Sequence, residues 1–223
     1  MDRRPYRHLH HGCSDALTPD LFPETHAGLV HLPGFACPQE AALIEAVHDI
    51  TAAAPFRQME TPGGKMMSVA MTNCGAAGWV TDRRGYRYAA TDPQTGKAWP
   101  AMPPLFRGLA VKAAEAAGFE DFEPDVCLVN CYVPRAKMTL HQDRDETDFS
   151  APIVSVSLGL PAVFLWGGAA RGDKASHVPL MSGDVLVWGG PARLNFHGVL
   201  PLRAGSHPLL GSSRVNLTFR KAL

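Results

Sequence analysis

Two histidines and one aspartate in this chain have the residue types and spacing of a mononuclear iron site. His141 and Asp143 form a His-x-Asp pair, and His197 follows much later in the sequence. Two imidazoles and one carboxylate make up the facial triad of non-heme Fe(II) oxygenases, which leaves coordination positions open for a co-substrate and O₂. In extended chain, side chains two residues apart point the same way, so His141 and Asp143 can contact one ion. The pattern predicts iron-dependent chemistry.

The His-x-Asp motif is short, and a second interpretation fits the same residues. The chain contains ten histidines, so such a pair can arise by chance. The stretch "HQDRDETD" at 141–148 is strongly polar and would also suit a solvated surface loop. A short motif is a hypothesis until its structural context supports it, so two further segments are needed to decide.

The C-terminal segment "SSRVNLTFRK" predicts a strand with one strongly polar face. Side chains alternate between the two faces of a strand, so its apolar residues share one side. The other face carries two guanidiniums, an amide and a hydroxyl, from Arg214, Asn216, Thr218 and Arg220. Guanidiniums bind carboxylates through paired charge-assisted hydrogen bonds, so this face would suit a dicarboxylate such as 2-oxoglutarate. The alternative is an edge strand with a solvated polar face.

A second strand, "DVCLVNCYVP" at 125–134, shows a similar pattern before the His-x-Asp pair. Val126, Leu128, Asn130 and Tyr132 share one face of this strand. Asn130 and Tyr132 are the polar members of an otherwise apolar segment, and buried polar groups need hydrogen-bonding partners. An internal network would satisfy them, and so would a ligand. Together with the arginine strand and the triad, a bound ligand is the favoured interpretation.

These segments, with several longer motifs, resemble the AlkB family of Fe(II)/2-oxoglutarate-dependent nucleic-acid dealkylases. The resemblance runs from about Pro55 to Arg220, and the first fifty residues carry little of it. The matching stretches are "APFRQM" (54–59), "TPGGKMMSVAMTNCG" (61–75), "DPQTGKAWPAMP" (92–103), "HQDRDE" (141–146), "APIVSVSLGLPAVF" (151–164), "GDVLVWGG" (183–190), "HGV" (197–199) and "RVNLTFR" (214–220).

The resemblance implies a role for each matching residue. The iron ligands would be His141, Asp143 and His197. The 2-oxoglutarate contacts would be Leu128, Asn130, Tyr132, Ser155, Arg214, Asn216 and Arg220, with Arg214 meeting the far carboxylate. A flipped base would stack between Trp79 and the imidazole of His141. Asp145 and Glu146 match an acidic pair near the exocyclic nitrogen of the base. Substrate-groove or phosphate contacts would come from Tyr86, Met71, Thr61 and Arg171.

Three departures from the family pattern bear on substrate preference and local packing. Asn195, two residues before the second histidine, stands where an aromatic residue is expected. Trp166 replaces a different aromatic residue in "FLWGG", and the stretch 169–181 matches poorly. None of these positions belongs to the iron or 2-oxoglutarate set.

The elements that position these residues are two helices followed by many short strands. Pro38–Ala54 and Pro104–Ala117 predict helices, the second of which stops at Gly118. Strands are predicted at 126–133, 153–158, 162–166, 184–188 and 214–220. This order indicates an α+β fold with helices that buttress a double-sheet jelly roll. The resemblance implies the same double-stranded β-helix, with residues 56–90, rich in Gly and Met, as a mobile lid.

Length and composition predict one domain over residues 1–223, with residues 1–30 as a poorly ordered extension. Five cysteines without metal-type spacing predict reduced thiols and a cytoplasmic location. No apolar stretch approaches the ~20 residues of a membrane span, and the N-terminal residues lack the apolar region of a secretion signal. Nothing in the sequence requires more than a monomer.

The charge balance is unusual for a nucleic-acid-binding protein. Lys and Arg number 21 and Asp and Glu also number 21, whereas such proteins tend to be basic. A local patch can suffice, and "DRRGYR" (82–87) places three arginines around Tyr86. Each arginine could equally be an ordinary solvated charge. Weak, salt-sensitive binding with a small footprint is expected.

The resemblance implies oxidative demethylation of N-alkylated bases such as 1-methyladenine and 3-methylcytosine. The substrate would be single- or double-stranded alkylated DNA, with 2-oxoglutarate converted to succinate and formaldehyde released. Two alternatives are an Fe(II)/2-oxoglutarate oxygenase that acts on RNA, a protein or a small molecule, and a metal-binding module without catalysis. The second leaves the Arg214–Arg220 face without a purpose and predicts no turnover of co-substrate.

Overall fold

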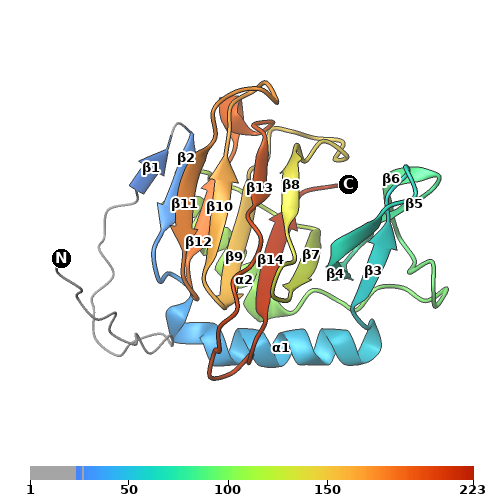
Figure 1. Cartoon of the computed structure of the whole chain (residues 1–223). Helices are drawn as coiled ribbons and strands as arrows, with labels where there is room; N and C mark the ends of the chain where they lie inside the picture. The colour runs from blue at the N-terminus through green and yellow to red at the C-terminus, as the bar shows by residue number, and fades with distance from the viewer. Residues whose placement is uncertain (1–23, 27) are drawn as a thin grey trace, which may run out of the picture.

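The strands pair into two facing antiparallel sheets in the computed structural model, which describes residues 24–26 and 28–223 (Figure 1). In spatial order the large sheet contains β1 (Glu24–His26), β2 (Leu29–Leu32), β12 (Val185–Trp188), β9 (Ile153–Gly159), β14 (Arg214–Arg220), β7 (Val126–Tyr132), β4 (Met66–Gly75) and β3 (Arg57–Glu60). The small sheet contains β11 (Ser176–Leu180), β10 (Ala162–Trp166), β13 (His197–Val199) and β8 (Met138–His141). The hairpin of β5 (Gly78–Asp82) and β6 (Gly85–Ala89) belongs to neither sheet.

The large sheet separates two hydrophobic layers. Successive side chains of a strand point to opposite faces, and the strands of this sheet carry apolar residues on both faces. On the outer face, Val215, Leu217 and Phe219 of β14 pack in one cluster with residues of both helices. On the inner face, Leu128 and Tyr132 of β7 pack in a second cluster with residues of the small sheet. The polar side chains of β14 therefore point between the two sheets, as its alternating pattern predicted.

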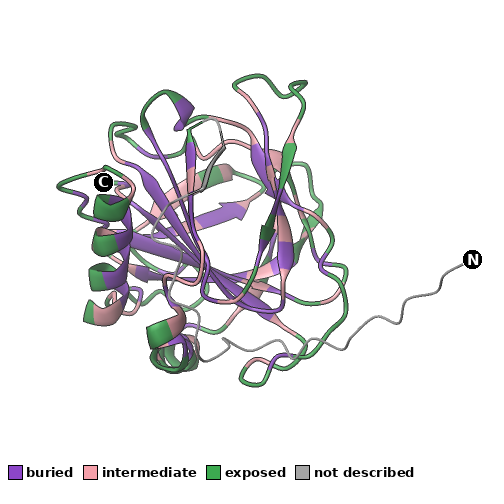
Figure 2. Ribbon diagram, turned by 90° about the vertical axis from the view of Figure 1, so that its left-hand side faces the viewer, coloured by how far each residue is buried: buried purple, intermediate pink, exposed green. Residues whose placement is uncertain are grey.

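Two helices cover the outer face of the large sheet. α1 (Glu40–Ala53) follows a short 3-10 helix, η1 (Cys37–Gln39), and α2 (Pro104–Ala116) begins at a proline. Figure 2 shows their buried residues on the sides turned to the sheet. The helix predicted from Pro38 thus begins as 3-10 turn, since Pro38 lies in η1. The second helix ends as predicted: Gly118 has a φ of +84°, and Phe119 N–H donates to the Ala114 carbonyl.

The α+β double-sheet fold is confirmed, and two parts of the prediction change. Residues 1–23 and 27 of the expected extension lie outside the described residues, but residues 24–26 and 29–30 pair in strands of the large sheet. The expected lid is not one loose segment. Its β3 and β4 are strands of the large sheet, where buried side chains such as Val69 and Met71 fix them, and the β5–β6 hairpin stands outside it.

The cysteines and helices bear on two predictions, that the thiols are reduced and that no segment spans a membrane. Cys74, Cys127 and Cys131 are free thiols, whereas Cys37 is disulfide-bonded, so the prediction of uniformly reduced cysteines is wrong at Cys37. None of the helices in the described part of the chain has the length and apolar character needed to span a bilayer.

Candidate active site

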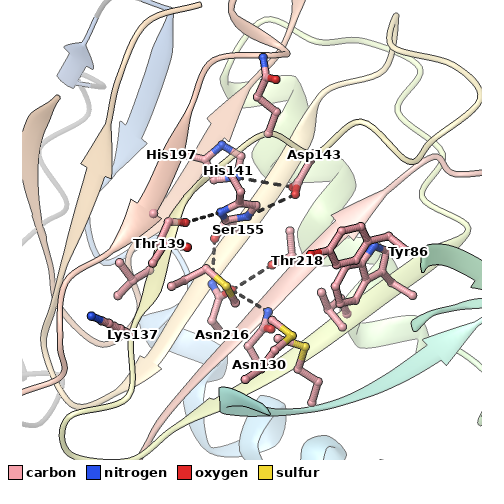
Figure 3. A pocket seen from close by; sticks show the side chains of 18 of the residues that line it. Tyr86, Asn130, Lys137, Thr139, His141, Asp143, Ser155, His197, Asn216 and Thr218 are labelled. Carbon is pink, nitrogen blue, oxygen red and sulfur yellow. Dashed lines mark hydrogen bonds and ion pairs between the residues drawn. The ribbon is translucent and has the colours of Figure 1, made fainter. Parts of the chain in front are cut away.

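His141, Asp143 and His197 meet between the two sheets. His141 ends β8 and is the direct register partner of His197 at the start of β13, with the ring centroids 4.4 Å apart. Asp143 Oδ1 lies 3.5 Å from His141 Nε2, and its Oδ2 lies 3.7 Å from His197 Nε2 (Figure 3). One ligand atom from each residue lies within 4.8 Å of the others, which would let them bind a single cation.

Backbone carbonyls fix both imidazoles with Nε2 toward the centre. His141 Nδ1 donates to the Thr139 carbonyl and His197 Nδ1 donates to the Asn195 carbonyl, each at 2.9 Å. Metal-binding histidines commonly donate their second ring nitrogen in this way, which sets the tautomer and the ring orientation. Because Asn195 contributes its backbone carbonyl to this bond, the unexpected side chain at this position leaves the histidine geometry unchanged.

The pKa shifts of Asp143 and His197 suit metal binding. Burial opposes ionisation of Asp143, but the Arg220 guanidinium and the two imidazoles outweigh it and hold the Asp143 pKa well below its usual range. Burial lowers the pKa of His197, helped by the neighbouring His141. A carboxylate binds a cation in its ionised form, and an imidazole binds it in its neutral form. Asp143 is therefore ionised and His197 neutral at neutral pH, as metal binding requires. At His141 burial lowers the pKa, but the Asp143 carboxylate and the Thr139 carbonyl outweigh it and raise the pKa, so a cation there must displace a proton.

Asp143 lies just beyond the strand that the sequence predicted for it. β8 ends at His141, and Asp143 occupies the following loop. Arg220 Nη2 and Nε donate to Asp143 Oδ2 at 2.6 and 3.1 Å, and Arg193 Nη1 donates to its backbone carbonyl at 2.8 Å. Hydrogen bonds from arginines, rather than a β-ladder, therefore fix this carboxylate.

Arg214 is a buried cation with unused hydrogen-bond donors. It is 1% exposed, its Nη2 donates to Ser157 Oγ at 2.9 Å, and its guanidinium lies 5.0 Å from the Tyr132 ring centroid. Among the described residues, its Nε and Nη1 have no hydrogen-bond partner, and burial lowers its pKa. A buried charge without a partner is costly, so this position suits an anionic ligand.

Asn216 connects two other residues predicted to contact 2-oxoglutarate, Ser155 and Asn130. Its Nδ2 donates to Ser155 Oγ at 2.8 Å, and its Oδ1 accepts from Asn130 Nδ2 at 3.3 Å and from Thr218 Oγ1 at 2.9 Å. Asn130 Oδ1 and Arg220 Nη1 are buried and unpartnered. Some of the predicted residues thus keep free polar atoms for a ligand. Asn216 instead forms hydrogen bonds that hold neighbouring side chains of β7, β9 and β14 in place.

All of the predicted site residues line one cavity of about 810 Å³. The predicted metal ligands share it with the predicted 2-oxoglutarate contacts, which are Leu128, Asn130, Tyr132, Ser155, Arg214, Asn216 and Arg220. The predicted substrate contacts also line it, and these are Thr61, Met71, Trp79, Tyr86, Asp145, Glu146 and Arg171. A cavity of this size can hold a small co-substrate and a second group beside it.

The β5–β6 hairpin brings an aromatic pair to this cavity. Trp79 and Tyr86 stack with ring centroids 5.6 Å apart and an interplanar angle of 16°. Trp79 Nε1 donates to Asp145 Oδ2 at 2.7 Å, so Asp145 joins the hairpin to the loop that carries Asp143. Tyr86 is 49% exposed, an unusual degree for a large aromatic side chain that lines a cavity.

Glu146 is engaged inside the protein, unlike its neighbour Asp145. Its Oε1 accepts from Tyr88 Oη at 2.6 Å, and its Oε2 lies 3.2 Å from Arg193 Nη2. It is 7% exposed, and Arg220 Nε lies 3.3 Å from Oε1. A direct contact from Glu146 to a base stays a prediction, and both of its carboxylate oxygens already have partners in the protein.

The arginines of "DRRGYR" are paired with carboxylates of the same region. Arg84 and Arg87 both bond Asp82, at 2.9 and 2.8 Å, and Arg83 bonds Glu60 at 3.0 Å. Arg171 donates to the Leu140 carbonyl at 2.7 Å and lies over the Phe196 ring. Lys65 and Lys137 line the cavity and have no carboxylate partner among the described residues. The positive surface at the cavity is therefore small.

Sequence reasoning missed Arg193 and Tyr88. Arg193 is 3% exposed and bonds the Asp143 and Ala151 carbonyls as well as Glu146. The one available signal was a charged residue within the short segment "GGPARL" (189–194), otherwise apolar and small, which precedes His197. Tyr88 gave no signal, because its contact with Glu146 joins parts of the chain that lie far apart in sequence.

Comparisons with known proteins agree with this geometry. The model of the 2OG-Fe(II) oxygenase superfamily matches residues 28–220. The alpha-ketoglutarate-dependent dioxygenase AlkB of Escherichia coli (strain K12) is 57% identical over 196 residues, which cover 88% of this chain and 91% of that protein. The DNA N(6)-methyladenine demethylase ALKBH1C of Arabidopsis thaliana is 35% identical over 174 residues, which cover 66% of this chain and 38% of that protein.

A solved structure supports the same assignment. The structure of OsALKBH1 superposes with a TM-score of 0.78 at 33% identity and covers 93% of this chain and 99% of its own. Identity of this order over nearly the whole chain, with the same fold, shows common ancestry. The chain therefore belongs to the 2OG-Fe(II) oxygenase superfamily and, within it, to the AlkB family of iron- and 2-oxoglutarate-dependent dioxygenases.

Proposed function

We propose that this dioxygenase removes N-linked methyl groups from nucleobases in DNA, with 1-methyladenine and 3-methylcytosine as substrates. The reaction consumes O₂ and 2-oxoglutarate and yields succinate, CO₂, formaldehyde and the unmodified base. The observation that carries the proposal is a single cavity. Three cation ligands, a buried unpaired guanidinium and an aromatic pair on a hairpin all line it. These are the parts needed for a metal, an anionic co-substrate and a planar base.

The metal would be held by His141 Nε2, His197 Nε2 and a carboxylate oxygen of Asp143. The donor set fits Fe(II), since two imidazoles and one carboxylate leave positions for other ligands. When bound, the iron supplies the oxidising chemistry, which transfers one oxygen atom of O₂ to succinate and the other to the methyl carbon. The hydroxymethyl group that results leaves as formaldehyde, with its hydroxyl proton returned to the base nitrogen or to water.

The protein binds and orients the co-substrate through its buried cations. Arg214 would take one carboxylate of 2-oxoglutarate through an unpartnered guanidinium nitrogen, beside the Tyr132 ring. The free Nη1 of Arg220 provides a further donor, while Leu128, Asn130 and Ser155 line the wall. A 2-oxo acid held at both ends would lie with its reacting carbons beside the triad, and the closed sides of the cavity limit access of water.

The base would enter from the side of the hairpin. It must first leave its stack, at a cost of roughly a few kcal/mol that is least for single strands or for lesions that block pairing. Methylation of a ring nitrogen makes the base cationic, so it gains from a stack between Trp79 and His141 and from the nearby Asp145 carboxylate. Asp145 is exposed and bonds the indole of Trp79, which places its charge at the edge of the proposed stack.

Binding of the strand itself is proposed to be weak. Net charge is zero, and the hairpin arginines are neutralised by Asp82 and Glu60. Lys65, Lys137, Arg144 and Arg171 remain at the cavity for a small number of phosphates. The affinity should therefore fall with salt, with a slope that follows the small number of phosphates neutralised. We propose that the protein acts as a monomer in the cytoplasm on single- or double-stranded DNA, with RNA as the alternative substrate.

Trp79→Ala is expected to weaken binding of the damaged strand while leaving the metal and co-substrate set intact. Stacking of a base on an aromatic ring contributes about 1–3 kcal/mol, so the KM for the oligonucleotide should rise roughly tenfold or more. Succinate formed without DNA should stay unchanged, which can be measured in the same assay. Trp79→Phe keeps a stacking face and loses the bond to Asp145, so its KM for the oligonucleotide should lie between those of the unaltered chain and Trp79→Ala. A KM unchanged in Trp79→Ala would remove this residue from the substrate site.

The proposal as a whole is tested by mass spectrometry of a single-stranded oligonucleotide that carries one 1-methyladenine. The protein is incubated in air with Fe(II) and 2-oxoglutarate. Loss of one methyl group that depends on both additions supports demethylation. Formation of succinate with an unchanged DNA oligonucleotide overturns the DNA substrate, and the matching methylated RNA oligonucleotide then tests the alternative. Absence of both products would contradict the assigned activity.

A further inference from the structure

The carboxylate proposed to bind the metal is held by a buried cluster that reaches the hairpin. Arg220 connects Asp143 to Glu146, and Arg193 contacts both residues, at the Asp143 carbonyl and at Glu146 Oε2. Two guanidiniums and two carboxylates make the cluster neutral, and all four side chains are at most 10% exposed. Breaking one member of such a cluster is costly, because the remaining charges stay buried without compensation.

Two consecutive acidic residues attach the two strands of the hairpin to the loop that carries Asp143. Trp79 of β5 and Tyr88 of β6 are direct register partners. Trp79 Nε1 donates to Asp145 at 2.7 Å, and Tyr88 Oη donates to Glu146 at 2.6 Å. The Asp145 contact is exposed, whereas the Glu146 contact is partly buried. The first can exchange with a substrate, and the second keeps its geometry.

We infer that Tyr88, through Glu146, and Arg193, through Glu146 and the Asp143 carbonyl, are positioning residues that fix the loop of Asp143, so that order at the metal site and docking of the β5–β6 hairpin depend on each other. The inference rests on the proposed function, because Asp143 is taken as a metal ligand. It differs from the role that the family resemblance implied for Glu146: this carboxylate joins the hairpin to the metal ligand, and Asp145 faces the substrate.

The arrangement has a physical consequence for loading of the site. A cation at the triad would compete with Arg220 for the Asp143 carboxylate. A resulting movement of the Arg220 guanidinium would also displace Glu146, because both carboxylates contact this guanidinium. Tyr88 donates its only hydroxyl proton to Glu146, so the hairpin strand moves or stiffens with that carboxylate. Binding of metal and co-substrate should therefore order the hairpin before a base arrives.

Tyr88→Phe tests the inference with the smallest change, because the ring stays and only the hydroxyl is lost. The metal probe is Co(II), added to the full chain with 2-oxoglutarate. Binding is read from quenching of tryptophan fluorescence, since the Trp188 and Trp166 rings lie 5.0 and 6.4 Å from the His197 ring. Loss of a residue that orients a metal ligand typically weakens affinity about 10-fold or more, and that loss is expected here.

Hydrogen exchange of the hairpin amides supplies the second readout. In the unaltered chain, Co(II) with 2-oxoglutarate should slow exchange over residues 78–89, and Tyr88→Phe should abolish this protection. Thr81→Val is the matched control: it also removes one hydroxyl bond from the hairpin, to the Glu60 carbonyl at 3.2 Å, and has no contact with the cluster. Thr81→Val should keep both the Co(II) affinity and the protection.

Arg193→Lys extends the test from the other side of Glu146. It keeps the charge but not the fork that contacts three carboxyl and carbonyl groups, so it should weaken Co(II) binding as Tyr88→Phe does. The double variant should lose less than the product of the two effects, because both act through one carboxylate. Melting temperatures of all variants separate this effect from a general loss of fold.

The inference is overturned if Tyr88→Phe binds Co(II) as the unaltered chain does and its hairpin is still protected on loading. Failure of the proposed function gives a different pattern. In that case the unaltered chain binds Co(II) and its hairpin is protected, and Tyr88→Phe loses both the affinity and the protection. The unaltered chain nevertheless leaves the methylated oligonucleotide unchanged, so the positioning role is supported without the proposed substrate.

Discussion

Asp143→Ala is expected to abolish turnover of 2-oxoglutarate and of methylated DNA. Asp143 is the only anionic member of the proposed ligand set, and its oxygens lie 3.5 and 3.7 Å from the two Nε2 atoms. Without it, two neutral imidazoles would hold a divalent cation with no charge to offset it. The loss of activity should exceed 1,000-fold, on the order of 4 kcal/mol or more in transition-state stabilisation. Succinate formation measured against Fe(II) concentration provides the test.

The same substitution should also change the protein without metal. Arg220 loses its closest partner, at 2.6 Å, and keeps only Glu146. The folded protein should therefore lose stability as well as metal affinity, so the melting temperature must be recorded. Asp148→Ala is the matched control, since this exposed carboxylate of the same loop bonds only Ser150 and should leave activity unchanged. Retained turnover in Asp143→Ala would refute the ligand assignment.

Arg214→Met is expected to raise the 2-oxoglutarate concentration needed for half-maximal rate by about 100-fold. Truncation of one partner in a buried, hydrogen-bonded charge pair costs about 2–5 kcal/mol, and each ~1.4 kcal/mol is a factor of ten in affinity. Methionine fills much of the same space without charge, so the cavity wall is preserved. Steady-state rates of succinate formation across a range of 2-oxoglutarate concentrations measure the change.

Stability gives an independent view of Arg214. In the protein without ligand, the guanidinium is 1% exposed with two nitrogens unpartnered, so its removal should cost little stability or even add some. Addition of 2-oxoglutarate should raise the melting temperature of the unaltered chain and not that of Arg214→Met. Arg203→Met, which removes an exposed guanidinium shortly before β14, should behave as the unaltered chain. An unchanged 2-oxoglutarate dependence in Arg214→Met would place the co-substrate elsewhere.

Much of the site was predictable because its strands are regular. β14 alternates strictly, so the sequence alone assigned Arg214, Asn216, Thr218 and Arg220 to one face, and the packing of Val215, Leu217 and Phe219 against the helices confirms it. The His-x-Asp pair with a distant histidine indicated the triad for a different reason, since few residue combinations suit an open iron site. The α+β order of two helices and many strands likewise followed from hydrophobic period and turn residues.

Contacts between segments that are distant in the sequence could not be predicted in this way. Asp143 was expected on a strand, but it lies in a loop that Arg220 and Arg193 hold, from segments 77 and 50 residues away in sequence. The hairpin arginines looked like a phosphate-binding patch, and their pairing with Asp82 and Glu60 depends on side-chain directions at a turn and between neighbouring strands. Local periodicity carries no information about such partners.

The sequence by itself therefore determined which residues can bind a metal and an anion, because those choices depend on chemical type and on alternation along single strands. Only the tertiary structure decided how they are held. It placed His141 opposite His197 across two strands of the small sheet, left Arg214 with free donors, and engaged Glu146 with Tyr88 and Arg193. The physical reason is that buried charges must find partners from distant segments, and the folding of both sheets around one cavity selects them.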